Sequence, residues 1–352
     1  MEILQHIWGS TPEGEAIILY TMRNSRGSEV RLGNIGASVV AVSFADRDGR
    51  IDDVALGYRD AASYIGDGAA SGKSVGRVAG RIARGRMTVD GEEYRLETNN
   101  GRNHLHGGSK GFANLTWESR VEGNRVVFAL LSPDGDQGYP GELAVEAVYD
   151  FDDEDSLEVT YLARSSRTTA VNLTNHLYWN LAGEGSGRTI LDHELQLDCS
   201  KALEMDAEQI PTGRLIDVAG TPLDFTSFRR FGDDIESEFN HIRDFRGYDH
   251  CFAVDGWRKN ILGEVGQLRC PATGRRVDIL SSQPAAVVYT GNWLAGGCPV
   301  TKSGTRYDDY AGVSIECQRF SDAVNHPEFP SIILPAGELY CQKIVFRLGT
   351  YR

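Results

Sequence analysis

Apolar and polar residues alternate with a period of two in many short stretches of the chain. From Glu142 to Phe151, apolar side chains occupy every second position and charged side chains lie between several of them. The alternation recurs over residues 343–348. A period of two is typical of half-buried β-strands. Further strands are expected at residues 16–22, 37–44, 157–164, 169–173, 277–280, 286–289, 313–318 and 331–334.

Two stretches predict β-hairpins. Asp90-Gly91 lies between Met87–Val89 and Tyr94–Leu96, and this dipeptide is a strong signal for a tight hairpin turn. Residues 121–126, with Gly123 at their centre, predict a second hairpin.

Helical periodicity is scarce. Ala61–Ile65 and Phe228–Ile235 could each form a turn or two, and no stretch sustains an apolar stripe of helical period. Many short strands without crossover helices argue against a parallel sheet and favour an antiparallel sandwich or a barrel-like stack. No linker or internal repeat interrupts the pattern, so we expect one all-β domain over residues 1–352.

Composition limits the partners. The formal net charge is −14, which argues against nucleic acids and anionic membranes, because both attract basic surfaces. No apolar run approaches the ~18 residues that span a bilayer, and the first residues do not resemble a signal peptide. Six scattered cysteines without a C-x-x-C pair are expected to be reduced thiols rather than zinc ligands. We therefore expect a cytoplasmic protein. Whether it is a monomer or a homodimer stays open.

Most candidate chemistry lies in one segment of eight residues, Thr174-Asn175-His176-Leu177-Tyr178-Trp179-Asn180-Leu181. It holds a histidine between two asparagines and beside two aromatic rings. Buried polar groups need partners, and aromatic faces beside hydrogen-bonding side chains are typical of a sugar-binding cleft. The segment makes His176 the first candidate for catalysis.

Arginine and glycine alternate through Gly76–Arg86. The phosphate-binding pattern G-x-x-x-x-G-K-[ST] is absent, and no helix clearly follows. Arg77, Arg84 and Arg86 are expected at the surface. Arg81 lies among small and apolar residues and is expected to point inward, where it needs anionic or oxygen-rich partners.

Five further histidines divide into two groups. His104 and His106 lie two residues apart, on one face if the piece is a strand. They could ligate zinc, but the sequence identifies no third ligand, and a polar site of the sugar-binding kind is favoured. His6, His193 and His241 are expected in solvated loops.

Two carboxylates remain ambiguous when each is judged from its local sequence. Asp249 lies beside aromatic residues at the start of an apolar strand, where a turn residue is as plausible as a functional one. Glu316 shares one face of its predicted strand with Ser314 and Gln318. An exposed glutamate on a strand is common, so the pattern alone does not decide its role.

Taken together and in order, these motifs resemble the aldose 1-epimerase family, the galactose mutarotases. The resemblance covers nearly the whole chain. The matching stretches are Gly76–Arg86, Asn103–Gly108, Thr174–Leu181, Ile210–Gly213, Gly220–Phe225, Tyr248–His250, Tyr289–Asn292 and Gly312–Pro330.

The resemblance implies a large antiparallel β-sandwich of the galactose mutarotase type with few short helices and an open sugar cleft. It implies that His176 is the general acid and Glu316 the general base. Arg81, His106 and Asp249 are implied to bind the substrate, a small-molecule aldose. Interconversion of anomers by ring opening and closure needs an acid and a base, and it needs no metal and no cofactor.

Two other functions stay open at this point. One is a non-catalytic sugar-binding or regulatory protein on the same fold, although retention of both His176 and Glu316 argues against it. The other is a glycoside hydrolase that uses Asp249 and Glu316 as paired carboxylates.

Two positions depart from the family pattern. The family often has Asn before the site arginine, where this chain has Gly80, and Gln two residues before Tyr289, where it has Val287. Both lost groups would contact sugar hydroxyls. The preferred aldose therefore stays open, with galactose, glucose, xylose, arabinose or a modified sugar as candidates. The role of His104 also stays open, whereas Asn175 and Tyr178 are expected mainly to orient His176.

Overall fold

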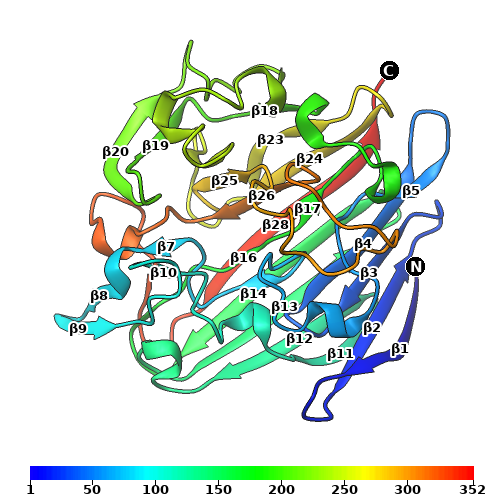
Figure 1. Cartoon of the computed structure of the whole chain (residues 1–352). Helices are drawn as coiled ribbons and strands as arrows, with labels where there is room; N and C mark the ends of the chain where they lie inside the picture. The colour runs from blue at the N-terminus through cyan, green and yellow to red at the C-terminus, as the bar shows by residue number, and fades with distance from the viewer.

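The largest sheet of the protein has nine strands, all paired antiparallel (Figure 1). It belongs to a computed structural model that describes residues 1–352. In spatial order its strands are β11 (Glu118–Glu122), β12 (Arg125–Ser132), β13 (Leu143–Phe151), β14 (Ser156–Ser165), β28 (Tyr340–Thr350), β24 (Arg275–Ser281), β23 (Gly263–Arg269), β18 (Glu194–Leu197) and β21 (Arg229–Arg230).

Two further sheets complete the framework. The five-stranded sheet holds β1 (Glu2–Ser10), β2 (Ala16–Arg23), β3 (Glu29–Gly33), β4 (Ser38–Ala45) and β5 (Ile51–Asp53). The six-stranded sheet holds, in spatial order, β17 (Tyr178–Trp179), β26 (Val313–Gln318), β25 (Ala285–Tyr289), β22 (Asp249–Ala253), β19 (Lys201–Met205) and β20 (Pro211–Asp217).

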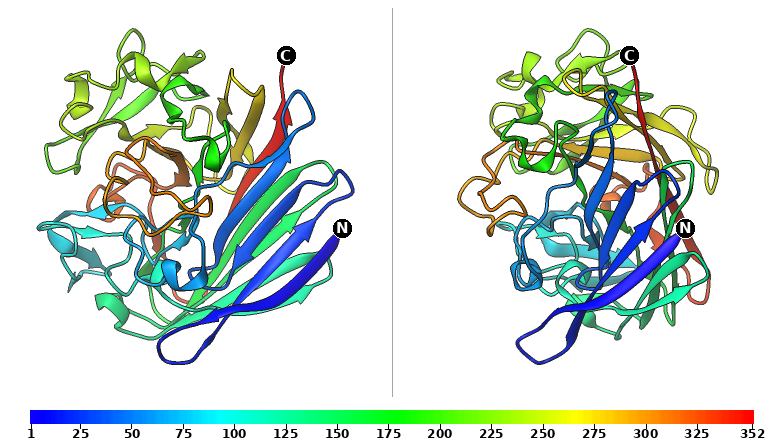
Figure 2. Two further views of the ribbon diagram at one scale, coloured as in Figure 1. Left: turned by 45° about the vertical axis from the view of Figure 1, so that its right-hand side comes forward. Right: turned by 90° about the vertical axis from the view of Figure 1, so that its right-hand side faces the viewer.

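One face of the nine-stranded sheet packs against both of the other sheets. The ring of Tyr20 on β2 meets that of Phe128 on β12 at 5.8 Å, and Trp179 on β17 meets Phe346 on β28 at 5.2 Å. The strand registers place Phe128 and Phe346 on the same face. Figure 2 shows the blue strands of the five-stranded sheet beside the green strands of the nine-stranded one. The predicted antiparallel β-sandwich is confirmed. The single domain stays a prediction, supported by a hydrophobic core that draws on all three sheets.

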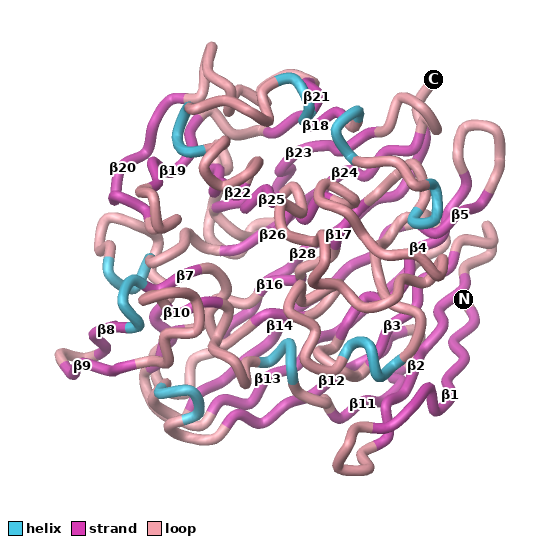
Figure 3. The backbone as a smooth tube through the Cα atoms, viewed as in Figure 1, coloured by secondary structure: helices cyan, strands magenta, loops and turns pink.

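The remaining elements are short and connect the sheets (Figure 3). Four two-stranded ladders pair β6 (Ser74–Val75) with β16 (Thr174–Asn175), β7 (Arg81–Ile82) with β10 (His104–Leu105), β8 (Arg86–Val89) with β9 (Glu92–Arg95), and β15 (Thr169–Ala170) with β27 (Ile333–Leu334). The helices are all 3₁₀ turns: η1 (Ala61–Tyr64), η2 (Ala83–Gly85), η3 (Phe112–Asn114), η4 (Asp136–Gly138), η5 (Glu184–Ser186), η6 (Ile190–Asp192), η7 (Phe231–Asp233), η8 (Phe239–His241) and η9 (Ala323–Asn325). No helix is long and apolar enough to cross a bilayer.

Burial and turn geometry explain why the sequence patterns predicted the strands. Buried and less buried residues alternate along β13, as the sequence predicted. Asp90 and Gly91 both have positive φ, 51° and 81°, which gives the tight turn between β8 and β9 the twist that a hairpin needs. The strand expected at residues 169–173 is shorter, because only Thr169–Ala170 pairs within a ladder.

Candidate active site

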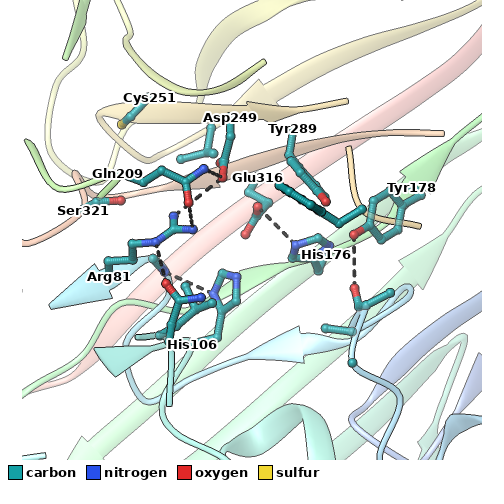
Figure 4. Close-up of a pocket in the computed structure, with 18 of the residues that line it drawn as sticks. Arg81, His106, His176, Tyr178, Gln209, Asp249, Cys251, Tyr289, Glu316 and Ser321 are labelled. Atoms are coloured by element: carbon teal, nitrogen blue, oxygen red, sulfur yellow. Dashed lines mark hydrogen bonds and ion pairs between the residues drawn. The ribbon is translucent and has the colours of Figure 1, made fainter. Parts of the chain in front are cut away.

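The five residues that the sequence marks as functional line one cavity of about 580 Å³ (Figure 4). Arg81 lies on β7, Asp249 on β22 and Glu316 on β26. His106 follows β10, and His176 lies between β16 and β17. These segments are far apart in the sequence, and their colours in Figure 1 show them converging from different parts of the chain. The fold therefore assembles the predicted set in full.

Strand register places the two carboxylates on the same face of the six-stranded sheet. Glu316 on β26 pairs with Val287 on β25, and two residues further along β25 Tyr289 pairs with Asp249 on β22. Residues two apart on a strand share a face. Glu316 is only 3% exposed, so it is a buried cleft residue and not the exposed strand glutamate that its local sequence left possible.

His176 lies where the chain passes from one sheet to another. Strand β16 pairs with β6, whereas β17 pairs with β26. The His176 N–H donates to the carbonyl of Lys73 at 2.8 Å, and its carbonyl accepts from the Gly72 N–H at 3.0 Å. The Tyr178 ring packs against the imidazole with centroids 4.9 Å apart. The backbone and the ring of this histidine are therefore both held in place.

Nε2 of His176 lies 3.4 Å from Oε1 of Glu316. Both side chains are buried, and Nδ1 of His176 and Oε2 of Glu316 have no hydrogen-bond partner. Burial lowers the pKa of His176 to about 4. Burial, with help from the negative charge of Asp249, raises the pKa of Glu316 to about 8. At neutral pH the pair therefore holds one proton between its two members.

His106 is held in one tautomer by the backbone. Its φ is 53°, and the Gly80 N–H donates to its Nδ1 at 3.2 Å. The imidazole is neutral in this environment, because burial keeps its pKa well below the usual value. Since Nδ1 accepts, the proton lies on Nε2, which can donate to an oxygen in the cleft.

His104 does not share this environment, because the strand that would have placed the two histidines on one face does not extend to His106. Strand β10 ends at Leu105, and the positive φ of His106 turns that side chain away. Nδ1 of His104 bonds the carbonyl of Glu97 at 2.7 Å, and its Nε2 bonds the hydroxyl of Tyr139 at 2.8 Å. His104 is a fully bonded structural residue.

Ligand atoms of His106, His176 and Glu316 lie within 4.8 Å of one another, close enough to consider a metal ion. A metal on Nε2 of His106 would displace the proton to Nδ1, where it would oppose the Gly80 N–H. The backbone thus disfavours ligation by His106. The absence of a metal cofactor stays a prediction with this physical support.

Arg81, Gln209 and Asp249 form a connected polar cluster on the opposite side of the cavity from Tyr178 (Figure 4). Arg81 donates to Oε1 of Gln209, and Nε2 of Gln209 donates to Oδ2 of Asp249 at 2.7 Å. The Arg81 guanidinium lies 3.6 Å from the same Asp249 oxygen. Asn100 accepts from Nε of Arg81 at 3.2 Å. The inward orientation predicted for Arg81 is confirmed.

Gln209 and Asn100 are cavity residues that the sequence interpretation missed. Gln209 lies in the turn between β19 and β20 with φ of 60°. The one signal that could have found it is its position directly before the family stretch Ile210–Gly213. Asn100 lies in the segment that precedes His104.

Aromatic rings complete the cavity wall and its mouth. Tyr178 and Tyr289 both pack against His176. Trp293 is 59% exposed, and the guanidinium of Arg246 lies 4.3 Å from the centre of its ring. Apolar faces beside a few convergent polar groups are typical of a site for a small polar ligand.

Two other residues of the segment Thr174–Leu181 hold the segment in place. The Asn175 amide donates to the carbonyl of Gly72 and to the hydroxyl of Tyr149. The Tyr178 hydroxyl donates to the carbonyl of Ala69 in the cavity wall. Two of these bonds tie the segment to the loop around residues 69–73 and the third ties it to β13, in agreement with the expected orienting role.

Two predicted surface residues are buried instead. The Arg77 guanidinium bonds the hydroxyl of Ser132 and the carbonyls of Ser132, Pro133 and Pro140. His193 accepts the Leu181 N–H on its Nε2 at 2.9 Å. In each case the partners lie on other segments, so the local sequence gave no sign of burial.

A β-sandwich that carries a buried acid–base pair in a polar cleft defines an enzyme that moves protons on a small polar substrate. The protein-family model described as Aldose 1-epimerase matches residues 19–347 of the chain. The chain is 39% identical to a galactose mutarotase from Bos taurus, over 99% of both chains. It is 35% identical to an aldose 1-epimerase from Escherichia coli K12, over 94% of both chains.

Solved structures agree. A galactose 1-epimerase from Lactobacillus acidophilus superposes with a TM-score of 0.85 at 27% identity, covering 100% of this chain and 99% of its own. An aldose epimerase homologue from C. elegans has a TM-score of 0.86 at 28% identity, with 94% of this chain and 98% of its own covered. The chain belongs to the aldose 1-epimerase family.

Proposed function

We propose that the cleft interconverts the α and β anomers of a free aldose by opening and closing the sugar ring. The observation that carries the proposal is the buried His176–Glu316 pair, with 3.4 Å between Nε2 and Oε1. Each side chain keeps one atom without a partner inside a cavity lined by hydrogen-bonding groups. Acid–base chemistry on a polyhydroxylated substrate fits this arrangement.

Glu316 acts as the base and His176 as the acid. The Glu316 carboxylate takes the proton of the C1 hydroxyl while Nε2 of His176 gives a proton to the ring oxygen, and the bond between C1 and that oxygen breaks. The open-chain aldehyde rotates about C1–C2. The ring then closes on the other face, with the two side chains exchanging roles. Each well-placed group is worth about 10²–10⁴ in rate.

The single proton that His176 and Glu316 hold at neutral pH is the number that ring opening and closure require. Ring opening needs a protonated His176 and a charged Glu316, which is the charge-separated form of a pair that carries one proton. Asp249 raises the pKa of His176 against the larger effect of burial, and Arg81 lowers the pKa of Glu316. Arg81 thereby favours the charged carboxylate of Glu316, whereas Asp249 favours a protonated His176 but opposes the ionisation of Glu316.

Arg81, His106 and Asp249 hold the sugar. Arg81 is permanently protonated and positions oxygen atoms, and His106 offers the proton on Nε2. Asp249 accepts from sugar hydroxyls while Gln209 fixes its orientation. This bonded state of Asp249 suits binding better than the proton donation that a glycoside hydrolase would require. Cytoplasmic location and a monomeric or homodimeric state stay predictions.

Anomer-resolved NMR on freshly dissolved α-aldoses tests the proposal. We expect the protein to accelerate equilibration of at least one aldose over the buffer rate, and His176→Ala and Glu316→Gln each to remove most of that acceleration. Saturable sugar binding without acceleration by the unmodified protein would instead support a non-catalytic sugar-binding protein. Release of reducing sugar from a glycoside would support a hydrolase.

A further inference from the structure

We infer that Ser321 and Gln318 form a subsite, beside Gly80, that recognises one hydroxyl group of the aldose and so sets sugar preference. The inference rests on the proposed function, and it concerns two residues to which the sequence assigned no role. It addresses the two positions, Gly80 and Val287, where this chain lacks polar side chains that the resemblance led us to expect.

Gln318 is a buried amide without partners. The side chain lines the cavity and has no measurable exposure, and neither its Oε1 nor its Nε2 makes a hydrogen bond. Leaving a buried polar group unpaired costs roughly 1–3 kcal/mol. An amide in this state, on the wall of a cleft, is a group that a hydroxyl of an entering ligand can satisfy as both donor and acceptor.

The position of Gln318 relative to the reacting pair fits a pyranose. Gln318 lies two residues after Glu316 on β26, so both side chains leave the same face of the strand, about 6.6 Å apart along it. A sugar whose C1 hydroxyl meets Glu316 therefore extends a more distant hydroxyl towards Gln318. Val287 pairs directly with Glu316 and contributes only an apolar surface to this part of the wall.

Ser321 occupies the space that Gly80 leaves open. A Cβ atom at position 80 would lie 2.6 Å from Oγ of Ser321 and 3.2 Å from Nε2 of Gln318. The φ of Gly80 is 77°, a value that few side chains tolerate. The glycine thus brings a serine hydroxyl and a glutamine amide to one small region of the wall, where any side chain at position 80 would collide with them.

The backbone holds Ser321 in this place. The Asp322 N–H donates to the carbonyl of Arg81 at 2.8 Å, and the Asp322 carboxylate accepts from the Ala83 N–H at 3.0 Å. These bonds join the segment after β26 to β7, which carries Arg81. Ser321 is 8% exposed and lines the cavity together with Gln318, so its hydroxyl is within reach of a ligand.

The test compares Ser321→Ala and Gln318→Leu with the unmodified protein, using the best aldose and its 2-, 3-, 4- and 6-deoxy analogues. Both kcat/KM for anomerisation and sugar binding by titration calorimetry are measured. We expect each variant to lower kcat/KM for the parent aldose roughly three- to tenfold, as for the loss of one hydrogen bond. For one deoxy analogue, the one that lacks the recognised hydroxyl, variant and unmodified protein should have equal kcat/KM.

Two controls separate recognition from structure. Ser227→Ala removes an exposed serine that does not line the cavity and should leave every sugar unaffected. The midpoint temperature of thermal unfolding of Gln318→Leu should be equal to or higher than that of the unmodified protein, because the buried amide makes no hydrogen bonds that the substitution could remove. A lower midpoint would indicate a structural role.

The outcomes distinguish the two proposals. Equal losses for the parent aldose and every deoxy analogue, or no loss for the parent, would overturn the subsite while leaving the epimerase proposal intact. If the unmodified protein accelerates no aldose, the epimerase proposal fails. The deoxy comparison by calorimetry then decides on the subsite alone: selective loss of binding supports it, and uniform loss or no binding rejects it.

Discussion

Nε2 of His176 and Oε1 of Glu316 lie 3.4 Å apart, and burial moves the pKa values of the two groups in opposite directions. The ordinary order is thereby reversed, since a free carboxyl group loses its proton before a free imidazolium does. The pair behaves as a unit that takes up one proton at high pH and a second at low pH.

The pH dependence of catalysis follows from this reversal. We expect kcat/KM to be level through the neutral range, to fall above about pH 8 as the pair loses its only proton, and to fall below about pH 4 as it gains a second. Polarimetry from pH 3.5 to pH 9.5, the range chosen to bracket both limits, measures the profile. A pH profile with a single change in kcat/KM, centred on the ordinary imidazole pKa, would contradict the conclusion that the two residues share one proton.

Stability should depend on the same carboxyl group. The folded-state pKa of Glu316 is raised, so the folded protein loses stability as pH rises from the ordinary glutamate pKa to about 8. At about 1.4 kcal/mol per pKa unit, the penalty at high pH is on the order of 5 kcal/mol. Glu316→Gln should therefore stabilise the protein at pH above 8 and have little effect near pH 4, as measured by urea unfolding. Equal effects at both pH values would show that the carboxyl group is not the cause.

Gln209→Ala should weaken substrate binding. The amide links Arg81 to Asp249, and without it both groups lose a partner and their fixed orientation. We expect kcat/KM to fall about tenfold, mostly through KM, in line with the loss of hydrogen bonds to charged groups. Gln5→Ala, at an exposed position on β1, is the matched control. A loss confined to kcat would place Gln209 in the chemical step instead.

Chelators should leave the rate unchanged. The Gly80 N–H holds His106 in the tautomer that presents a proton, not a lone pair, to the cleft. We expect the initial rate of anomerisation to be the same before and after dialysis against EDTA. Loss of activity that one divalent metal restores would mean that His106 changes tautomer and that the cluster of His106, His176 and Glu316 is a metal site.

Arg77→Lys should destabilise the fold. The guanidinium satisfies a serine hydroxyl and three carbonyl oxygens, and an ammonium group cannot reach all of them. We expect a loss of about 2–4 kcal/mol in the free energy of unfolding. The matched variant Arg84→Lys, at an exposed position, should stay within about 0.5 kcal/mol of the unmodified protein. Equal stability of the two variants would contradict the role assigned to Arg77.

The sequence predicts the strands well where one face of the sheet is buried and the other is not, as in β13, and where turn chemistry is strong, as at Asp90-Gly91. It predicts the site because the family motifs carry His176 and Glu316 in recognisable surroundings. Their mutual distance depends on the pairing of β17 with β26, which no local pattern encodes.

What the sequence did not predict depends on partners from distant segments. Arg77 is buried because the carbonyl groups that surround it come from residues 132–140. Gln209 enters the cleft because a turn with positive φ directs it there. His193 is buried because it caps the N–H of Leu181. The environment of each of these side chains is therefore set by the tertiary structure and cannot be predicted from the neighbouring sequence.

Both faces of strand β26 carry residues with a defined role, one face in the hydrophobic core and the other in the cavity. Val313, Ile315 and Cys317 belong to the hydrophobic core, whereas Glu316 and Gln318 line the cavity. A change on one face therefore endangers folding, and a change on the other endangers turnover. Evolution towards another sugar can instead act on Gln318, which takes no part in the proton transfer, and on cavity residues outside this strand, such as Gln209, Trp293 and Ser321.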